Sequence, residues 1–137
     1  MGSGIAHVFA LKGFEVTLVE AKKELADKAL AVIAKNLDRQ AAKGAVTAAD
    51  KDAALSRIKP ALSPKEAPGF QFAVEAVSER MELKTSVFRE LDAAAAPGAI
   101  LATNTSSLSV TEIAASVKDP SRVIGMHFMN PVPLMKL

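Results

Sequence analysis

The chain has 137 residues, of which 50% are hydrophobic and 23% are charged, and its formal net charge is +2. This length and composition predict one folded domain with a sizeable core and exclude a disordered tail. The chain contains no cysteine, which excludes disulfides and thiolate metal sites and is consistent with a cytoplasmic protein. Basic residues are scattered and no apolar run is long enough for a membrane span, so neither nucleic acid nor a membrane is expected as a partner.

Residues 2–12 predict a helix that begins with glycines, because apolar residues recur at helical spacing in Ile5, Val8 and Phe9. Gly2 and Gly4 at its start would let another backbone, or a phosphate, approach the positive end of the helix. The residues alone leave both interpretations open, tight packing and a phosphate site. His7 is expected to face solvent or to pack, without a catalytic role.

Residues 14–19 predict a strand, with alternating and β-branched residues, that ends in Glu20. In dinucleotide-binding folds, an acid at this position holds the ribose hydroxyls of NAD, and it would repel the additional phosphate of NADP. The alternative is an acid in a solvated loop, and for Glu20 taken alone that alternative is favoured.

Two consecutive helices are predicted next, a long amphipathic one over residues 23–43 and a short one over residues 47–57. This hairpin is too long for a minimal crossover between strands, so we expect it to project from the sheet and touch a substrate tail or a partner. Asn36 and Lys43 are exposed polar positions on it, and a solvated face is their default interpretation.

The second half of the chain alternates strands, helices and loops. The predicted order is strand 58–62, loop 63–69, strand 70–77, helix 81–95, strand 99–102, loop 103–107, a helix from Ser109 or Thr111 to Val117, and strand 122–128. Strand 70–77 is apolar enough to be buried on both faces. Glu75 within it therefore needs a partner, because a buried carboxylate is costly alone.

Alternating strands and helices predict an α/β fold with a doubly wound, mostly parallel sheet. Ligands bind such sheets outside the carboxyl ends of the strands. Polar groups fall at several of these ends, namely Glu20, Glu79, the loop 103–107 and residues 127–130. Their coincidence is the strongest argument from the residues themselves for a functional site.

Four segments, MGSGIAHVFALKGFEVTLVE, EAVSERMELK, ATNTSSLSVTEIA and GMHFMNPVPLMKL, occur in this order. Together they resemble the NAD-binding domain of the 3-hydroxyacyl-CoA dehydrogenases, including the 3-hydroxybutyryl-CoA dehydrogenases, over nearly the whole chain. The resemblance implies a Rossmann-like doubly wound sheet with an inserted helical hairpin. It implies NAD as cofactor, an acyl-CoA as substrate and a homodimer formed through a C-terminal helical domain.

The resemblance also implies roles for individual residues. It makes His127 the base that takes the proton of the 3-hydroxyl, Ser106 the partner of the substrate oxygen, and Asn130 a catalytic neighbour of the nicotinamide. The positions it implies around NAD are Gly2, Glu20, Glu79, Lys84, Ser106 and Asn130. By ungapped counting from Glu20 it implies contacts of Asn36 and Lys43 with CoA, and it implies no metal.

The chain departs from the family pattern at both ends. The first strand of the family and the first two glycines of its GxGxxG fingerprint are missing, and so is the glutamate that holds the histidine ring, which would follow Leu137. Ser78 stands where a proline is common. We therefore expect a partial NAD-binding domain over residues 1–137, with a gap where the first strand belongs. Two functions stay open, the cofactor domain of a dehydrogenase and a non-catalytic fragment with at most weak nucleotide or partner binding.

Overall fold

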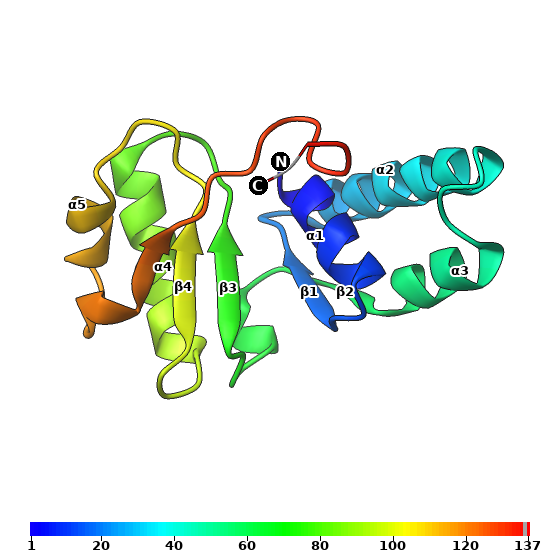
Figure 1. The fold of residues 1–137 in the computed structure, drawn as a ribbon. Helices are drawn as coiled ribbons and strands as arrows, with labels where there is room; N and C mark the ends of the chain where they lie inside the picture. Colours follow the sequence, from blue (N-terminus) through cyan, green and yellow to red (C-terminus); the bar gives the residue numbers. More distant parts are fainter. Residues whose placement is uncertain (136) are drawn as a thin grey trace. The chain divides into compact units, whose positions relative to one another are not determined.

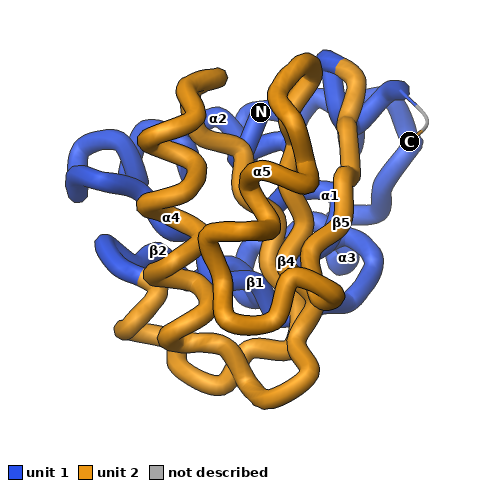
Figure 2. Tube along the Cα trace, turned by 90° about the vertical axis from the view of Figure 1, so that its left-hand side faces the viewer, with its two compact units in different colours: residues 1–63, 130–135 blue, residues 64–129, 136–137 orange. Residues whose placement is uncertain are grey.

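The computed structural model of the chain describes residues 1–135 and residue 137. The described residues fall into two compact units, which Figure 2 colours separately. Unit 1 contains Met1–Ser63 and Asn130–Met135, and unit 2 contains Pro64–Met129 together with Leu137. No helix within the described residues combines the length and the apolar character that a membrane crossing requires.

Unit 1 is built from helices around a short parallel pair of strands (Figure 1). In chain order its elements are α1 (Gly2–Leu11), β1 (Val16–Val19), α2 (Lys23–Ala42), α3 (Ala48–Ser56) and β2 (Ile58–Ala61). The pairing of β1 with β2 aligns Val16 with Ile58 and Val19 with Ala61. The helices and strands predicted for this half are therefore confirmed, with boundaries that shift by one or two residues.

The core of unit 1 is an apolar cluster to which every one of these elements contributes. Its buried residues are Ala6, Ala10, Leu18, Ile33, Leu37, Ala54 and Ile58. Ile33 and Leu37 are four residues apart, which places them on one face of α2. Because α3 contacts α1 and α2 and buries Ala54, the hairpin is part of this core. Projection of the hairpin toward a substrate tail or a partner stays a prediction, and the apolar face of α3 packs within unit 1.

Unit 2 contains a parallel sheet in the order β3-β4-β5, joined by helical connections. Its elements are η1 (Pro64–Glu66), β3 (Phe72–Glu75), α4 (Met81–Ala94), β4 (Ile100–Thr103), α5 (Val110–Ala114), η2 (Pro120–Arg122) and β5 (Val123–Gly125). Figure 1 shows α4 lying along the β3-β4-β5 sheet. The buried cluster of Phe88, Leu91, Leu101, Ile113 and Val117 joins α4 and α5 to this sheet.

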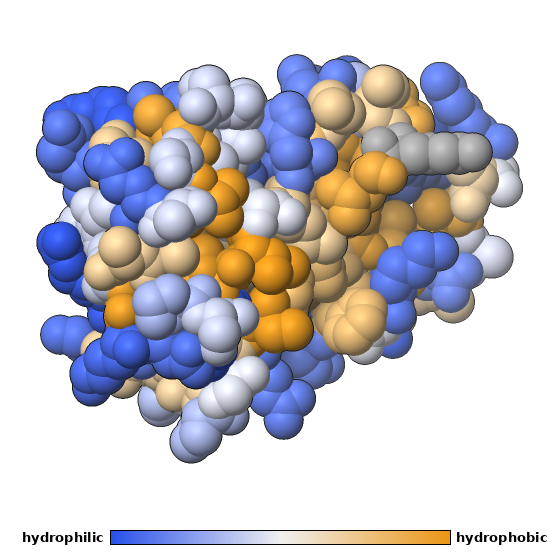
Figure 3. Space-filling model, turned by 60° about the vertical axis from the view of Figure 1, so that its left-hand side comes forward, coloured by the Kyte–Doolittle hydropathy of each residue, from blue (hydrophilic) through white to orange (hydrophobic). Residues whose placement is uncertain are grey.

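The second face of the β3-β4-β5 sheet carries exposed apolar side chains. Phe72 is 38% exposed, and Ile100 and Ile124 are each 42% exposed. Phe72 pairs with Ile100, and Ile124 pairs with Ala102, so these side chains share one face because side chains alternate along a strand. Figure 3 shows apolar patches of this kind among polar surface on one side of the molecule. The prediction that strand 70–77 is buried on both faces was therefore wrong, since α4 and α5 pack against the face that holds Leu101.

The strand pairing divides the strands between two parallel sheets. In the described part of the chain, β1 and β2 form one sheet and β3, β4 and β5 form another, so β1 and β3 each pair along one edge only. Every observed pairing is parallel, as a doubly wound sheet requires. The α/β class and the parallel, helix-connected topology are confirmed.

Candidate functional site

The carboxyl ends of β3 and β4 carry a buried polar cluster centred on Glu75. The Glu75 side chain accepts hydrogen bonds from Lys84 Nζ at 2.8 Å, from Thr103 Oγ1 at 2.7 Å and from the Val77 amide at 2.7 Å. Glu75 and Thr103 are paired across the two strands, so the sheet register itself brings them together. The prediction that Glu75 needs a partner is confirmed.

Lys84 is the cation of this cluster and is almost completely buried, with 1% exposure. It projects from α4, and its Nζ lies 2.8 Å from Glu75 and 3.3 Å from Glu79. Moving a charged lysine or carboxylate from water into a protein interior costs roughly several kcal/mol per ion. Only well-placed partners of opposite charge offset this cost. The buried Lys84 is therefore held between two carboxylates.

Glu79 connects this cluster to the loop after β4. Its Oε1 accepts hydrogen bonds from the amides of Ser106 at 2.9 Å and Ser107 at 3.1 Å, and from the hydroxyl of Thr105. The Thr105 hydroxyl, followed by the two amides and Lys84, lowers the pKa of Glu79 to about 2. Glu79 is thus ionised at neutral pH, and its charge stabilises the conformation of the loop that carries Ser106.

Ser106 and His127 form a hydrogen-bonded pair at the surface of unit 2. Ser106 Oγ lies 2.9 Å from His127 Nε2. Ser106 follows β4 and His127 follows β5, and these neighbouring strands are parallel, so their carboxyl ends lie at the same edge of the sheet. Both side chains are exposed and can reach a small molecule.

A hydroxyl in contact with an imidazole can bind an oxygen atom and exchange a proton with it. The imidazole of histidine changes its protonation state near neutral pH, which suits it to act as a general base or acid. Which atom donates in the Ser106–His127 bond depends on the tautomer of the ring. The pair therefore suits a reaction in which a substrate hydroxyl loses or gains a proton.

Unit 1 holds the residues predicted at the adenosine part of a dinucleotide. Glu20 follows β1 directly, and its amide donates to the Ala61 carbonyl at 3.0 Å. Among the described residues, no atom outside the helix lies within 4 Å of the position that a Cβ at Gly2 would take. At Gly4, a Cβ would lie 3.0 Å from the Cβ of Val132. Of the two glycines for which a close approach was predicted, Gly4 therefore has one and Gly2 does not, because the segment Asn130–Met135 packs against Gly4.

The remaining predicted residues, Asn36, Lys43 and Asn130, belong to unit 1. Asn36 is half-buried on α2, and Lys43 is the exposed C-cap residue of the same helix. Asn130 is exposed and belongs to unit 1, whereas Ser106 and His127 belong to unit 2. The position of Asn130 beside a nicotinamide stays a prediction.

Three residues of the site were not singled out individually from the sequence, although the loop 103–107 that contains all three was. Thr103 and Thr105 bind the two carboxylates, and Asn104 Oδ1 accepts a hydrogen bond from the Phe128 amide at 2.6 Å. Threonine and asparagine directly after a strand often bond to nearby backbone. That tendency marks the loop 103–107, but it does not name the partners.

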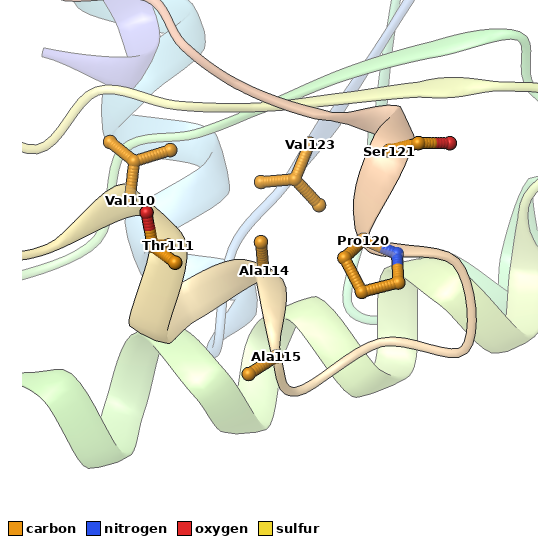
Figure 4. Close-up of a pocket in the computed structure, with 7 residues that line it drawn as sticks. All are labelled: Val110, Thr111, Ala114, Ala115, Pro120, Ser121 and Val123. Atoms are coloured by element: carbon orange, nitrogen blue, oxygen red, sulfur yellow. The ribbon is translucent and has the colours of Figure 1, made fainter.

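A hollow of ≈ 470 Å³ lies elsewhere on unit 2 (Figure 4). It is lined by seven residues of α5, its C-cap, η2 and β5, namely Val110, Thr111, Ala114, Ala115, Pro120, Ser121 and Val123. None of the predicted site residues lines it. Within residues 1–135 and 137, no group of three or more histidine, aspartate or glutamate side chains is placed to hold a metal ion.

Comparisons with known proteins identify the family of this chain. Residues 1–137 match the family described as "3-hydroxyacyl-CoA dehydrogenase, NAD binding domain". The chain is 46% identical to a probable 3-hydroxybutyryl-CoA dehydrogenase of Bacillus subtilis and 45% identical to a 3-hydroxybutyryl-CoA dehydrogenase of Bradyrhizobium diazoefficiens, in each case over 100% of this chain and 48% or 47% of the relative. A crystal structure of (S)-3-hydroxybutyryl-CoA dehydrogenase from Ralstonia eutropha superposes with a TM-score of 0.95 and 39% identity, over 100% of this chain and 48% of that one.

The chain thus spans about half the length of the curated relatives it matches. The matched half contains the parallel strands, the glycine-led helix and the Ser106–His127 pair described above. The chain belongs to the family of NAD-binding domains of the 3-hydroxyacyl-CoA dehydrogenases.

Proposed function

We propose that this chain is the cofactor-binding part of an NAD-dependent 3-hydroxyacyl-CoA dehydrogenase. In this reaction the 3-hydroxyl of the acyl-CoA becomes a ketone, its proton goes to a base, and its hydride goes to NAD. The single observation that carries the proposal is the 2.9 Å contact between Ser106 Oγ and His127 Nε2, in a chain of an NAD-binding family. The relatives named above, which are called 3-hydroxybutyryl-CoA dehydrogenases, support an acyl-CoA substrate.

In this proposal, His127 accepts the proton of the 3-hydroxyl and Ser106 holds the same oxygen by a hydrogen bond. Holding the oxygen in a fixed position keeps the reacting atoms close to the distance at which they react. NAD, when bound, supplies the acceptor for the hydride. Asn130 is proposed to orient the nicotinamide.

The residues of unit 1 fit the adenosine half of NAD. Helix α1 begins at Gly2 with open space beside it and without an acidic residue in its first turn, which suits a phosphate. Glu20 at the end of β1 suits the ribose hydroxyls. Asn36 and Lys43 on α2 are proposed to contact CoA, where the ammonium of Lys43 would face a phosphate.

Glu79 and Lys84 are proposed to lie near the cofactor as well. Both already make contacts within unit 2, Glu79 with the loop 105–107 and Lys84 with two carboxylates. We therefore assign them mainly to holding the loop that carries Ser106. A homodimer formed through a C-terminal helical domain, which the family resemblance implies, is part of the same proposal.

A second function is supported by the strand pairing. In the described part of the chain, β1 and β3 each have one unpaired edge. An unpaired edge leaves backbone groups without partners, so these strands are expected to support a bound dinucleotide less well than a continuous sheet would. The alternative is a non-catalytic piece that binds a nucleotide or a partner weakly. For the 137-residue chain with 3-hydroxybutyryl-CoA and NAD, we expect no formation of NADH, and measurable NADH absorbance would overturn this alternative.

The experiment that tests the cofactor assignment is a titration of the chain with NAD and with NADP, followed by NMR. We expect NAD to shift the amides of residues 2–4 and Glu20, and NADP to bind more weakly. Glu20→Ala should reduce the preference for NAD, whereas Glu24→Ala, an exposed acid on α2, should not. No NAD-induced shift at any of these amides would overturn the assignment.

A further inference from the structure

Asn104 connects the ends of the strands in unit 2 by hydrogen bonds of its backbone and its side chain. It is the first residue after β4, and its backbone amide donates to the Glu75 carbonyl at 2.8 Å. Its side-chain Oδ1 accepts a hydrogen bond from the Phe128 amide at 2.6 Å. Asn104 is thus tied to β3 by its backbone and holds the segment after β5 by its side chain.

His127 lies beyond the end of the short strand β5, so strand pairing alone does not fix the backbone on both sides of it. The strand ends at Gly125, and the Met126 amide still donates to the Thr103 carbonyl at 2.8 Å. His127 comes next and is exposed. The bond from Phe128 to Asn104 therefore holds the backbone on the other side of His127.

The two members of the Ser106–His127 pair have separate anchors. The Ser106 amide is held at 2.9 Å by Glu79. The backbone of His127 is held on its far side by Asn104. The position of the hydroxyl and the position of the imidazole are therefore set by different side chains.

We propose that Asn104 is a positioning residue for His127, whose side-chain carbonyl fixes the Phe128 amide so that the imidazole meets Ser106. Its catalytic meaning rests on the proposed dehydrogenase function, but the positioning itself does not. The pair is sensitive to small shifts. From the observed 2.9 Å, a displacement of about 0.6 Å takes the two atoms to about 3.5 Å, where a hydrogen bond is lost.

The test removes the acceptor of Asn104 and observes His127 directly. In Asn104→Leu the side chain keeps a similar size without an acceptor, and in Asn104→Asp an oxygen acceptor remains. The readout is the 15N chemical shifts of the His127 ring in the 137-residue chain, recorded in alkaline buffer, where they report the tautomer and its hydrogen bonding. Ser106→Ala supplies the shifts of a ring that has lost this bond, and His7→Gln assigns the signals.

We expect the His127 shifts of Asn104→Leu to move to those of Ser106→Ala, and those of Asn104→Asp to stay nearer the unaltered chain. Gln71→Leu, an exposed amide of the same unit, should leave the shifts unchanged. Asn104→Ala is measured in parallel, and circular dichroism verifies the folding of each variant. The proposal is overturned if either folded variant without the acceptor keeps the unaltered His127 shifts.

This outcome is separate from that of the cofactor titration. No NAD and no substrate are present in the measurement, so failure of the dehydrogenase proposal leaves the role of Asn104 in place. Conversely, unaltered His127 shifts in Asn104→Leu would leave NAD binding by unit 1 untouched.

Discussion

Unit 1 and unit 2 both contain parallel strands covered by helices, but they differ in the polar and charged side chains that they bury. The core of unit 1 is apolar, and its buried His7 binds Gln40 at 3.2 Å through Nε2 while Nδ1 has no hydrogen-bond partner among the described residues. The core of unit 2 contains Glu75 and Lys84, and both are bonded to neighbours.

This difference has a consequence for the candidate site. An apolar core loses stability gradually as side chains are trimmed, whereas a buried ionic network fails when one member is removed. In unit 2 that network extends from Glu75 through Lys84 to Glu79, and Glu79 binds the Ser106 amide. Stability and site geometry are therefore coupled in unit 2, and the core of unit 1 has no such network.

The largest effect is expected from Lys84→Met in unit 2. It leaves Glu75 buried without its cation, which should lower the free energy of unfolding of unit 2 by about 3–5 kcal/mol. Amide hydrogen exchange within α4 and β4 measures this loss of stability. Exchange of the amides of unit 1 shows whether the loss extends to that unit. Glu75→Leu combined with Lys84→Met should recover part of the loss.

Lys28→Met, at an exposed position of α2, is the matched control and should change little. A loss below about 1 kcal/mol for Lys84→Met, the level of an exposed ion pair, would show that the network is not what distinguishes unit 2.

A smaller loss of stability is expected when a helix cap is removed, and it should be the same in the two units. Thr47 Oγ1 accepts from the Asp50 amide at the start of α3, and Ser109 Oγ accepts from the Glu112 amide at the start of α5. Replacing either by alanine should cost about 1 kcal/mol, because one helix amide loses its partner. Exchange of the Asp50 and Glu112 amides measures it. Clearly unequal losses would show that the units differ outside their buried groups as well.

The smallest effect is expected from pH, and it should reach unit 1 first. Burial lowers the pKa of His7 below its ordinary value of 6.5, with an opposing contribution from Gln40. The neutral ring is thus favoured in the folded state, so stability is complete above 6.5 and is lost as pH falls below that value. For Glu79 the pKa falls from 4.5 to about 2, so its contribution is present above 4.5 and is lost as pH falls toward 2.

Exchange rates of each unit across this range measure the order of the two losses. His7→Gln should remove the loss in unit 1 that begins near neutral pH, and Glu79→Gln should remove the acid loss in unit 2. The Glu79 effect is reduced by solvent screening, since its side chain is 37% exposed. If unit 2 lost stability at a higher pH than unit 1 as the solution is acidified, the predicted order of the two units would be contradicted.

Part of this protein was predictable from its residues because the signals are local. Alternating strands and amphipathic helices gave the α/β class, and the rule of strand ends placed Ser106 and His127 at one edge of a sheet. The last strand is shorter than its residues predict. Residues 122–128 were predicted as a strand, but β5 covers Val123–Gly125, because the Phe128 amide bonds to a side chain instead of the ladder.

The sequence by itself determined the periodicity of the elements, the need of Glu75 for a partner and the polar residues that follow the strand ends. The tertiary structure alone decided that the partners of Glu75 are Lys84 and Thr103, that Val132 approaches Gly4 and that Asn104 holds Phe128. The physical reason is distance along the chain. Periodicity and capping depend on neighbours a few residues apart, whereas the Asn104–Phe128 bond joins residues 24 positions apart and forms only when the strands pair in register.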